Sequence, residues 1–339
     1  MQMNIIGAKH FITENIKKKL VPMLAGSPGL GKSAIVHEIA KEFGLKVIDI
    51  RLAQCDPCDL MGFPTIDKDS GKAFYAPMST FPIEGDALPK GYNGWLIFLD
   101  EFNSASRAVQ KAAYKLVLDR MVGEHHLHKN VAMVCAGNLE TDGAIVEAMS
   151  TALQSRVVHA GLMVDSEAWL EWATANDIDH RITSFIRFKP DNLYTFRPDH
   201  SDRTYGCPRT WEFANRHTNG LPTVGNDLLP VLSGCLSEGL AREFVGFCRI
   251  YADLPTIDQI VKDPVNIKMP AEPSILFALS GSLSNHSTPD KMDKLMQFIE
   301  RMPIEFQVVT LREVVRRKVE MMQVPAIQKW VATQARELF

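Results

Sequence analysis

Short apolar runs alternate with segments of helical periodicity through the first half of the chain. Ile35, Ile39 and Phe43 recur at helical spacing, and Gly44 stands where a helix C-cap is expected. A second helical pattern extends from Val109 to Val117. The apolar runs before, between and after these helices are residues 21–25, 46–50, 95–99, 131–135 and 157–162. Because strands alternate with helices, the pattern predicts an α/β fold with a parallel sheet covered on both faces.

The pattern changes from about Asp165 onward. Helical segments are then separated by clusters of Pro, Gly and Asn, such as residues 189–192 and 218–222. Met292, Leu295, Met296 and Ile299 form one amphipathic stripe at helical spacing. We therefore expect the second half of the chain to be all-helical.

Composition and charge narrow the class of protein. Of 339 residues, 46% are hydrophobic and 23% charged, which excludes disorder for most of the chain. Lys and Arg number 37 against 40 Asp and Glu, a net charge of −3 that excludes a globally basic, nucleic-acid-coating protein but leaves a local basic groove open. No apolar run approaches the roughly 20 residues of a membrane-spanning helix. The start of the chain has no secretion signal and the six cysteines are scattered, so we expect a cytoplasmic protein without membrane contact.

A phosphate-binding loop lies between the first predicted strand and the first predicted helix. The segment fits the pattern Gly-x-x-x-x-Gly-Lys-Ser/Thr and consists of Gly26, Ser27, Pro28, Gly29, Leu30, Gly31, Lys32 and Ser33. Glycines let successive backbone N–H groups wrap a phosphate, and the helix N-terminus adds partial positive charge. We expect Lys32 to reach the β and γ phosphates of a nucleotide and the Ser33 hydroxyl to bind Mg²⁺.

Two carboxylates and an asparagine follow two of the other strands. Asp100 and Glu101 end the apolar run 96–99, and ligands of open α/β sheets bind at the carboxyl ends of strands. Asp100 suits the Mg²⁺ shell, and Glu101 suits a general base for the attacking water. A helix cap is the alternative for the acidic pair, and the phosphate loop upstream favours the catalytic interpretation. Asn138 could orient water beside Glu101 or occupy a turn.

In this order the motifs resemble the AAA+ ATPases, and within them the MoxR-like branch. Residues 26–33 look like Walker A, 96–101 like Walker B and Asn138 like sensor 1. Arg156 aligns with the arginine finger and Arg209 with the sensor 2 arginine, although each by itself suits a surface ion pair. The stretches 59–64 and 169–173 also look like this branch, so the resemblance covers roughly residues 20–265.

The resemblance implies an arrangement of domains and chains. The AAA+ parallel-sheet nucleotide-binding core would comprise residues 1–163, an all-helical lid residues 164–265, and C-terminal helices residues 266–339. In this family the nucleotide lies between protomers of a ring, usually a hexamer. Arg156 would then act on the ATP of the neighbouring chain, and Arg209 would act in cis from the lid.

Two segments depart from the family pattern. Residues 67–93, where the family inserts a helix, are rich in Pro and Gly and poorly helical, and the hairpin 121–130 is short. How a ring of this chain grips a client is therefore left open.

Two groups of residues contain side chains of the kind that bind metal ions. Cys55 and Cys58 have the spacing of a redox or zinc half-site, but no second half follows them along the chain. His125, His126 and His128 could bind a metal, although adjacent histidines in a hairpin rarely face one point. The alternative for the two cysteines is an ordinary loop, and the alternative for the three histidines is a solvated turn.

These observations predict an ATPase that uses ATP and Mg²⁺ in a homo-oligomeric ring to remodel or activate a client protein. By resemblance, the client would carry a von Willebrand A domain. Two alternatives stay open: an AAA+ nucleic-acid motor or loader, and a nucleotide switch that does not hydrolyse. Glu101 argues against the switch, since a protein that only binds nucleotide needs no base.

Overall fold

The computed structural model describes residues 1–142, 147, 149 and 151–334. The chain forms two compact units, Met1–Asp165 and Ser166–Phe339. No helix in the described part of the chain is both long and apolar enough to cross a bilayer.

A six-stranded sheet is the centre of the first unit. Its strands are β1 (Gln2–Met3), β2 (Pro22–Ala25), β3 (Leu45–Arg51), β6 (Gly94–Asp100), β9 (Val131–Gly137) and β10 (Val158–Leu162). They lie in the order β1-β10-β2-β9-β6-β3, and every neighbouring pair is parallel. The five predicted strands are confirmed. The edge strand β1 was not predicted, because two residues starting with a polar glutamine give no apolar run.

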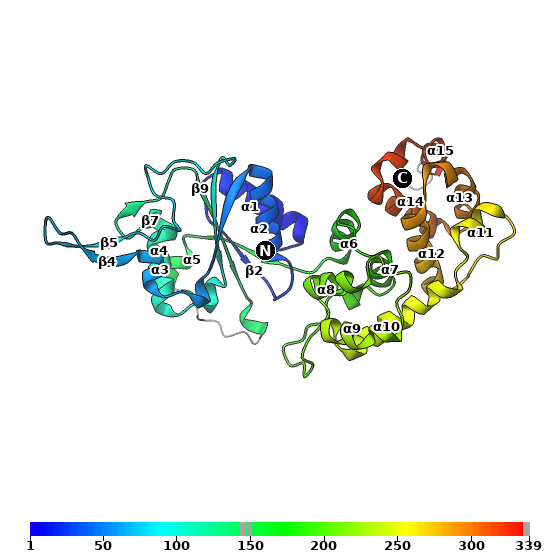
Figure 1. Cartoon of the computed structure of the whole chain (residues 1–339), viewed down its shortest axis with the longest axis horizontal. Helices are drawn as coiled ribbons and strands as arrows, with labels where there is room; N and C mark the ends of the chain where they lie inside the picture. Colours follow the sequence, from blue (N-terminus) through cyan, green and yellow to red (C-terminus); the bar gives the residue numbers. More distant parts are fainter. Residues whose placement is uncertain (143–146, 148, 150, 335–339) are drawn as a thin grey trace. The chain divides into compact units, whose positions relative to one another are not determined.

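Helices cover both faces of this sheet, as predicted. They are α1 (Ile5–Lys17), α2 (Lys32–Phe43), α3 (Pro57–Met61), α4 (Arg107–Asp119) and α5 (Thr151–Gln154). Figure 1 shows α1 and α2 on one side of the strands and α3 and α4 on the other. In β6, Ile97 and Leu99 pack in one apolar cluster with α4, and the whole apolar run of this strand is buried. Gly44 caps α2 in the left-handed conformation, with φ of 62°.

Two short hairpins extend from this core. One pairs β4 (Phe63–Ile66) with β5 (Ala73–Ala76), and the other pairs β7 (Met121–Val122) with β8 (His125–His126). The first hairpin projects away from the sheet (Figure 1), and Phe63 and Ile66 are 64% and 68% exposed. Residues 67–93 contain no helix, as their Pro and Gly content predicts.

All the regular secondary structure among the described residues of the second unit is helical, as predicted. Its helices are α6 (Ser166–Ala175), α7 (His180–Phe188), α8 (Pro208–Thr218), α9 (Leu229–Leu236), α10 (Glu238–Cys248), α11 (Ile257–Lys262), α12 (Pro273–His286), α13 (Met292–Ile299), α14 (Ile304–Arg317) and α15 (Pro325–Gln334). The predicted stripe of Met292, Leu295, Met296 and Ile299 lies in α13 and is buried in an apolar cluster with α12 and α14. Helix α12 packs against α7 and α14. A domain boundary at residue 265 stays a prediction.

Candidate functional site

Three strands of the first unit end at the same edge of the sheet. Strand β9 lies between β2 and β6, with Ala25 opposite Gly137 and Leu99 opposite Cys135. Because all three strands are parallel, the segments that follow their carboxyl ends meet there. The phosphate loop follows β2, Asn138 follows β9, and Asp100 ends β6.

The loop after β2 adopts the conformation that its glycines permit. Gly29 and Gly31 have φ of 80° and 85°, in the left-handed region that favours glycine, and Gly31 is the N-cap of α2. The Gly26 N–H donates to the carbonyl of Gly137 at 3.2 Å, which ties the loop to β9. The Ser27 hydroxyl donates to Asp142 Oδ1 at 3.2 Å. The loop therefore joins a strand to a helix N-terminus, an arrangement that favours an anion.

The ammonium group of Lys32 is buried among oxygen atoms of this edge. It donates to the carbonyl oxygens of Gly26 and of Ser27, the latter at 3.1 Å, and to Asn138 Oδ1 at 3.2 Å. The lysine that the motif identifies and the asparagine that follows β9 are thus brought together, although 106 positions separate them.

Ser33 and Asp100 form the second contact across this edge. The Ser33 hydroxyl donates to Asp100 Oδ2 at 3.2 Å, and Asp100 Oδ1 accepts from the backbone N–H of Glu101 at 2.8 Å. A hydroxyl and a carboxylate side by side are hard oxygen donors of the kind that Mg²⁺ binds together with substrate phosphates and water. The donor set fits this ion. No group of three or more His, Cys, Asp or Glu side chains able to hold a metal occurs among the described residues, which include Cys55, Cys58 and the hairpin histidines.

Glu101 turns the chain sharply at the end of β6. Its φ of 54° lies in the left-handed region, and the short 3₁₀ helix η2 (Phe102–Ser104) follows it directly. A residue other than glycine rarely takes this conformation, and such residues cluster at functional sites. The side chain of Glu101 is half-buried.

Asn103, which no sequence pattern singles out, clamps the backbone of Asn138. Its Nδ2 donates to the Asn138 carbonyl at 2.7 Å, and its Oδ1 accepts from the Asn138 N–H at 3.0 Å. A Cβ at the preceding Gly137 would lie 2.4 Å from Asn103 Oδ1, so glycine is needed there. In the sequence, Asn103 is one more polar residue after the acidic pair, and only its partner 35 positions away reveals what it does.

Arg156 lies at the edge of the sheet where the parallel strands begin, opposite the edge that carries the phosphate loop. It directly precedes Val157 and β10, and Val158 at the start of β10 bonds to Val21 and pairs with Pro22, at the amino end of β2. Its guanidinium carbon lies 4.9 Å from the centre of the Tyr114 ring, and Nη1 donates to the Ser155 hydroxyl at 3.1 Å. The amino and carboxyl ends of parallel strands face opposite edges, so the fold does not bring Arg156 to the phosphate loop of its own chain.

Arg209 belongs to the second unit. It is exposed in the first turn of α8, one residue after the proline that begins the helix. Its role as a sensor arginine stays a prediction.

Comparison with known proteins finds similarity in the segment that contains the predicted Walker motifs. Residues 22–159 match the family described as "ATPase family associated with various cellular activities (AAA)". Among solved structures, the RuvB Holliday junction branch migration motor of Thermotoga maritima is 18% identical, with 82% of this chain and 80% of that chain covered and a TM-score of 0.37. A proposed ATPase of Cytophaga hutchinsonii is 14% identical, with 98% and 88% covered and a TM-score of 0.36. NtrX of Brucella abortus in complex with ADP is 13% identical, with 98% and 66% covered and a TM-score of 0.37.

Proposed function

We propose that this chain, whose residues 22–159 form an AAA-family ATPase domain, hydrolyses ATP with Mg²⁺ in an oligomeric ring and thereby remodels a partner protein. One observation supports the hydrolytic part above all others. The loop lysine, the Ser33–Asp100 pair and Asn138 lie together at the carboxyl edge of the sheet. These groups are the ones that phosphoryl transfer from a nucleotide requires.

In this proposal the loop binds the phosphates of ATP. Backbone N–H groups and the start of α2 cradle them, and Lys32 exchanges neutral carbonyl partners for charged phosphate oxygens, which are stronger hydrogen-bond acceptors. Ser33 and Asp100 would hold Mg²⁺, which would supply positive charge to the β and γ phosphates.

Hydrolysis then proceeds by attack of water on the γ phosphorus. Glu101 accepts a proton from this water as its oxygen bonds to phosphorus, the bond to the bridging oxygen breaks, and ADP leaves. Asn138, held in place by Asn103, orients the water. A guanidinium, Arg156 of a neighbouring chain, stabilises the charge that develops on the transferred group.

The partner is proposed to be a protein. The resemblance to the MoxR-like branch supports a hexameric ring and a client with a von Willebrand A domain. The β7–β8 hairpin disfavours a nucleic-acid client, because residues 121–130 offer only one lysine and three histidines, and no Phe, Tyr or Trp for base stacking.

Nucleotide binding provides the direct test. We expect Lys32→Ala to abolish ATP binding in a calorimetric titration, because its ammonium is the mobile cation that the loop offers to the phosphates. Lys41→Ala, on the exposed face of the same helix, is the matched control and should bind ATP like the unaltered chain. ATP binding of unchanged affinity in Lys32→Ala would show that the loop has been assigned wrongly.

The clamp on Asn138 predicts a positioning role for Asn103. Asn103→Ala removes both bonds to the Asn138 backbone, and a shift of about 1 Å in a catalytic group costs on the order of 10²-fold in rate. We expect turnover to fall by this order while ATP affinity is retained. Asn103→Asp keeps the acceptor and loses the donor, so it should be intermediate. Asn176→Ala, which removes an exposed asparagine of the second unit, is the control, and equal turnover in all three variants would contradict the role.

A further inference from the structure

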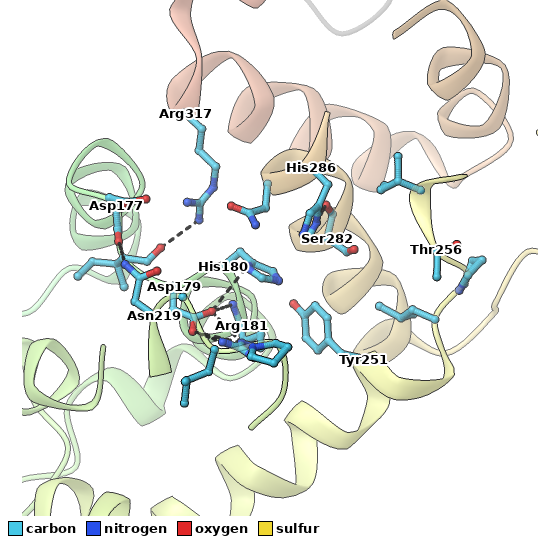
Figure 2. Close-up of a pocket in the computed structure, with 18 of the residues that line it drawn as sticks. Asp177, Asp179, His180, Arg181, Asn219, Tyr251, Thr256, Ser282, His286 and Arg317 are labelled. Atoms are coloured by element: carbon cyan, nitrogen blue, oxygen red, sulfur yellow. Dashed lines mark hydrogen bonds and ion pairs between the residues drawn. The ribbon is translucent and has the colours of Figure 1, made fainter. Parts of the chain in front are cut away.

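The second unit contains a cavity that the proposed ATPase cycle does not use. Its volume is about 660 Å³, within the range of sites for small organic ligands. The lining residues come from the start of α7, from the loop 219–222, from the segment 251–258, from the end of α12, and from Lys291 and Arg317. Figure 2 shows the side chains of His180, Tyr251 and Arg317 converging there from three different elements.

Most of the charges in this cavity are neutralised in pairs. Arg181 binds the Asp179 carboxylate through Nε at 3.0 Å and Nη2 at 2.7 Å. Burial acts to raise the pKa of Asp179, but these bonds hold it below its ordinary value. Lys291 pairs with Asp258 at 2.9 Å. Burial lowers the pKa of His180 to about 3, so its ring is uncharged near pH 7.

Arg317 differs from these groups, because its charge is not paired. Its Nη2 makes two long contacts of 3.3 Å, to the carbonyl of Ile178 and to the hydroxyl of Thr183, and it forms no ion pair with any residue that the structure describes. The side chain is only partly exposed and extends from the end of α14 toward His180 (Figure 2). The other unpaired charge of the lining, Asp177, is exposed. A half-buried guanidinium held only by neutral groups favours a bound anion.

Apolar residues also line the cavity. They are Ile178, Leu221, Pro222, Leu254, Pro255 and Ile257. Small-molecule sites commonly combine such a surface with a few placed polar groups that fix the orientation of the ligand. An inorganic anion would use Arg317 alone, whereas an organic anion would also cover the apolar residues.

We propose that this cavity binds a small organic anion, in which a phosphate or carboxylate group pairs with Arg317 and an apolar body contacts Leu221, Leu254 and their neighbours. The site consists of residues of the second unit only. It is therefore independent of whether the first unit hydrolyses ATP.

Calorimetric titration of the full chain with phenyl phosphate tests this proposal. The Lys32→Ala variant is used, so that the phosphate loop contributes no binding. We expect saturable binding with Kd on the order of 1 mM or tighter, and inorganic phosphate should bind about tenfold more weakly because it lacks the apolar body. Benzoate shows whether a carboxylate is accepted in place of the phosphate.

Two variants of α14 provide the test of Arg317 and its control. Arg317→Gln should weaken phenyl phosphate binding by about ten- to hundredfold, the effect of losing a charged hydrogen bond. Arg312→Gln, an exposed position on the same helix, should leave it unchanged. Should Arg317→Gln not fold, Arg317→Lys keeps the charge without the planar fork and should bind several-fold more weakly. Absence of saturable binding at tens of millimolar, or equal affinity in the Arg317 and Arg312 variants, would overturn the proposal.

Discussion

Replacing Arg156 with alanine is expected to reduce ATP turnover by about 10³–10⁵-fold, the range known for a guanidinium that stabilises phosphoryl transfer. ATP affinity should stay near that of the unaltered chain, because Arg156 precedes β10 at the amino edge of the sheet while the loop follows β2 at the carboxyl edge. Steady-state hydrolysis and an ATP titration measure the two effects. Arg242→Ala, at an exposed arginine of the second unit, is the control and should retain full turnover.

The same variant tests whether the site is shared between chains. Mixing Arg156→Ala with Lys32→Ala, each inactive alone, should restore part of the turnover, because an intact Arg156 of one chain meets an intact nucleotide site of another. The total rate of ATP hydrolysis by the unaltered chain should also rise faster than linearly with protein concentration, because rings assemble as the concentration rises. An inactive mixture of variants that demonstrably co-assemble would exclude an arginine supplied in trans.

Replacing Glu101 with glutamine is expected to lower turnover by about 10²–10⁴-fold, the contribution typical of a general base. Glutamine keeps the size and polarity of the side chain, so the left-handed turn at this position and the binding of ATP should be retained. Glu124→Gln, at the exposed turn between β7 and β8, is the matched control. Rapid hydrolysis by Glu101→Gln would mean that another residue is the base.

Two companion experiments separate the roles of the acidic pair and identify the client. Asp100→Asn should weaken Mg²⁺ binding and raise the Mg²⁺ concentration needed for half-maximal turnover, because it removes the charge from the oxygen pair formed with Ser33. Glu101→Gln should accumulate in the ATP-bound state, so its isolation from a native lysate should retain the client. Recovery of nucleic acid in place of a protein would contradict the proposed class of partner.

The sequence by itself determined the sheet and the phosphate loop. Both depend on neighbours along the chain: a buried parallel strand needs a continuous apolar run, and a phosphate-binding turn needs glycines at fixed spacing before a helix. The runs at 95–99 and 131–135 therefore became β6 and β9, and Gly29 and Gly31 adopted the predicted turn. The position of Asp100 and Asn138 at one edge also followed, since parallel strands end on the same side.

Only the tertiary structure decided which distant residues meet. Strand β1 is too short to leave a pattern, and Asn103 and Arg317 are recognisable only through partners 35 and more than 130 positions away. The lateral order of the strands, which places β9 between β2 and β6 and so brings Asn138 beside the loop, is decided only when the segments pack. Periodicity along a chain reports how each segment is buried, whereas hydrogen bonds between a side chain and a remote backbone arise only when those segments pack.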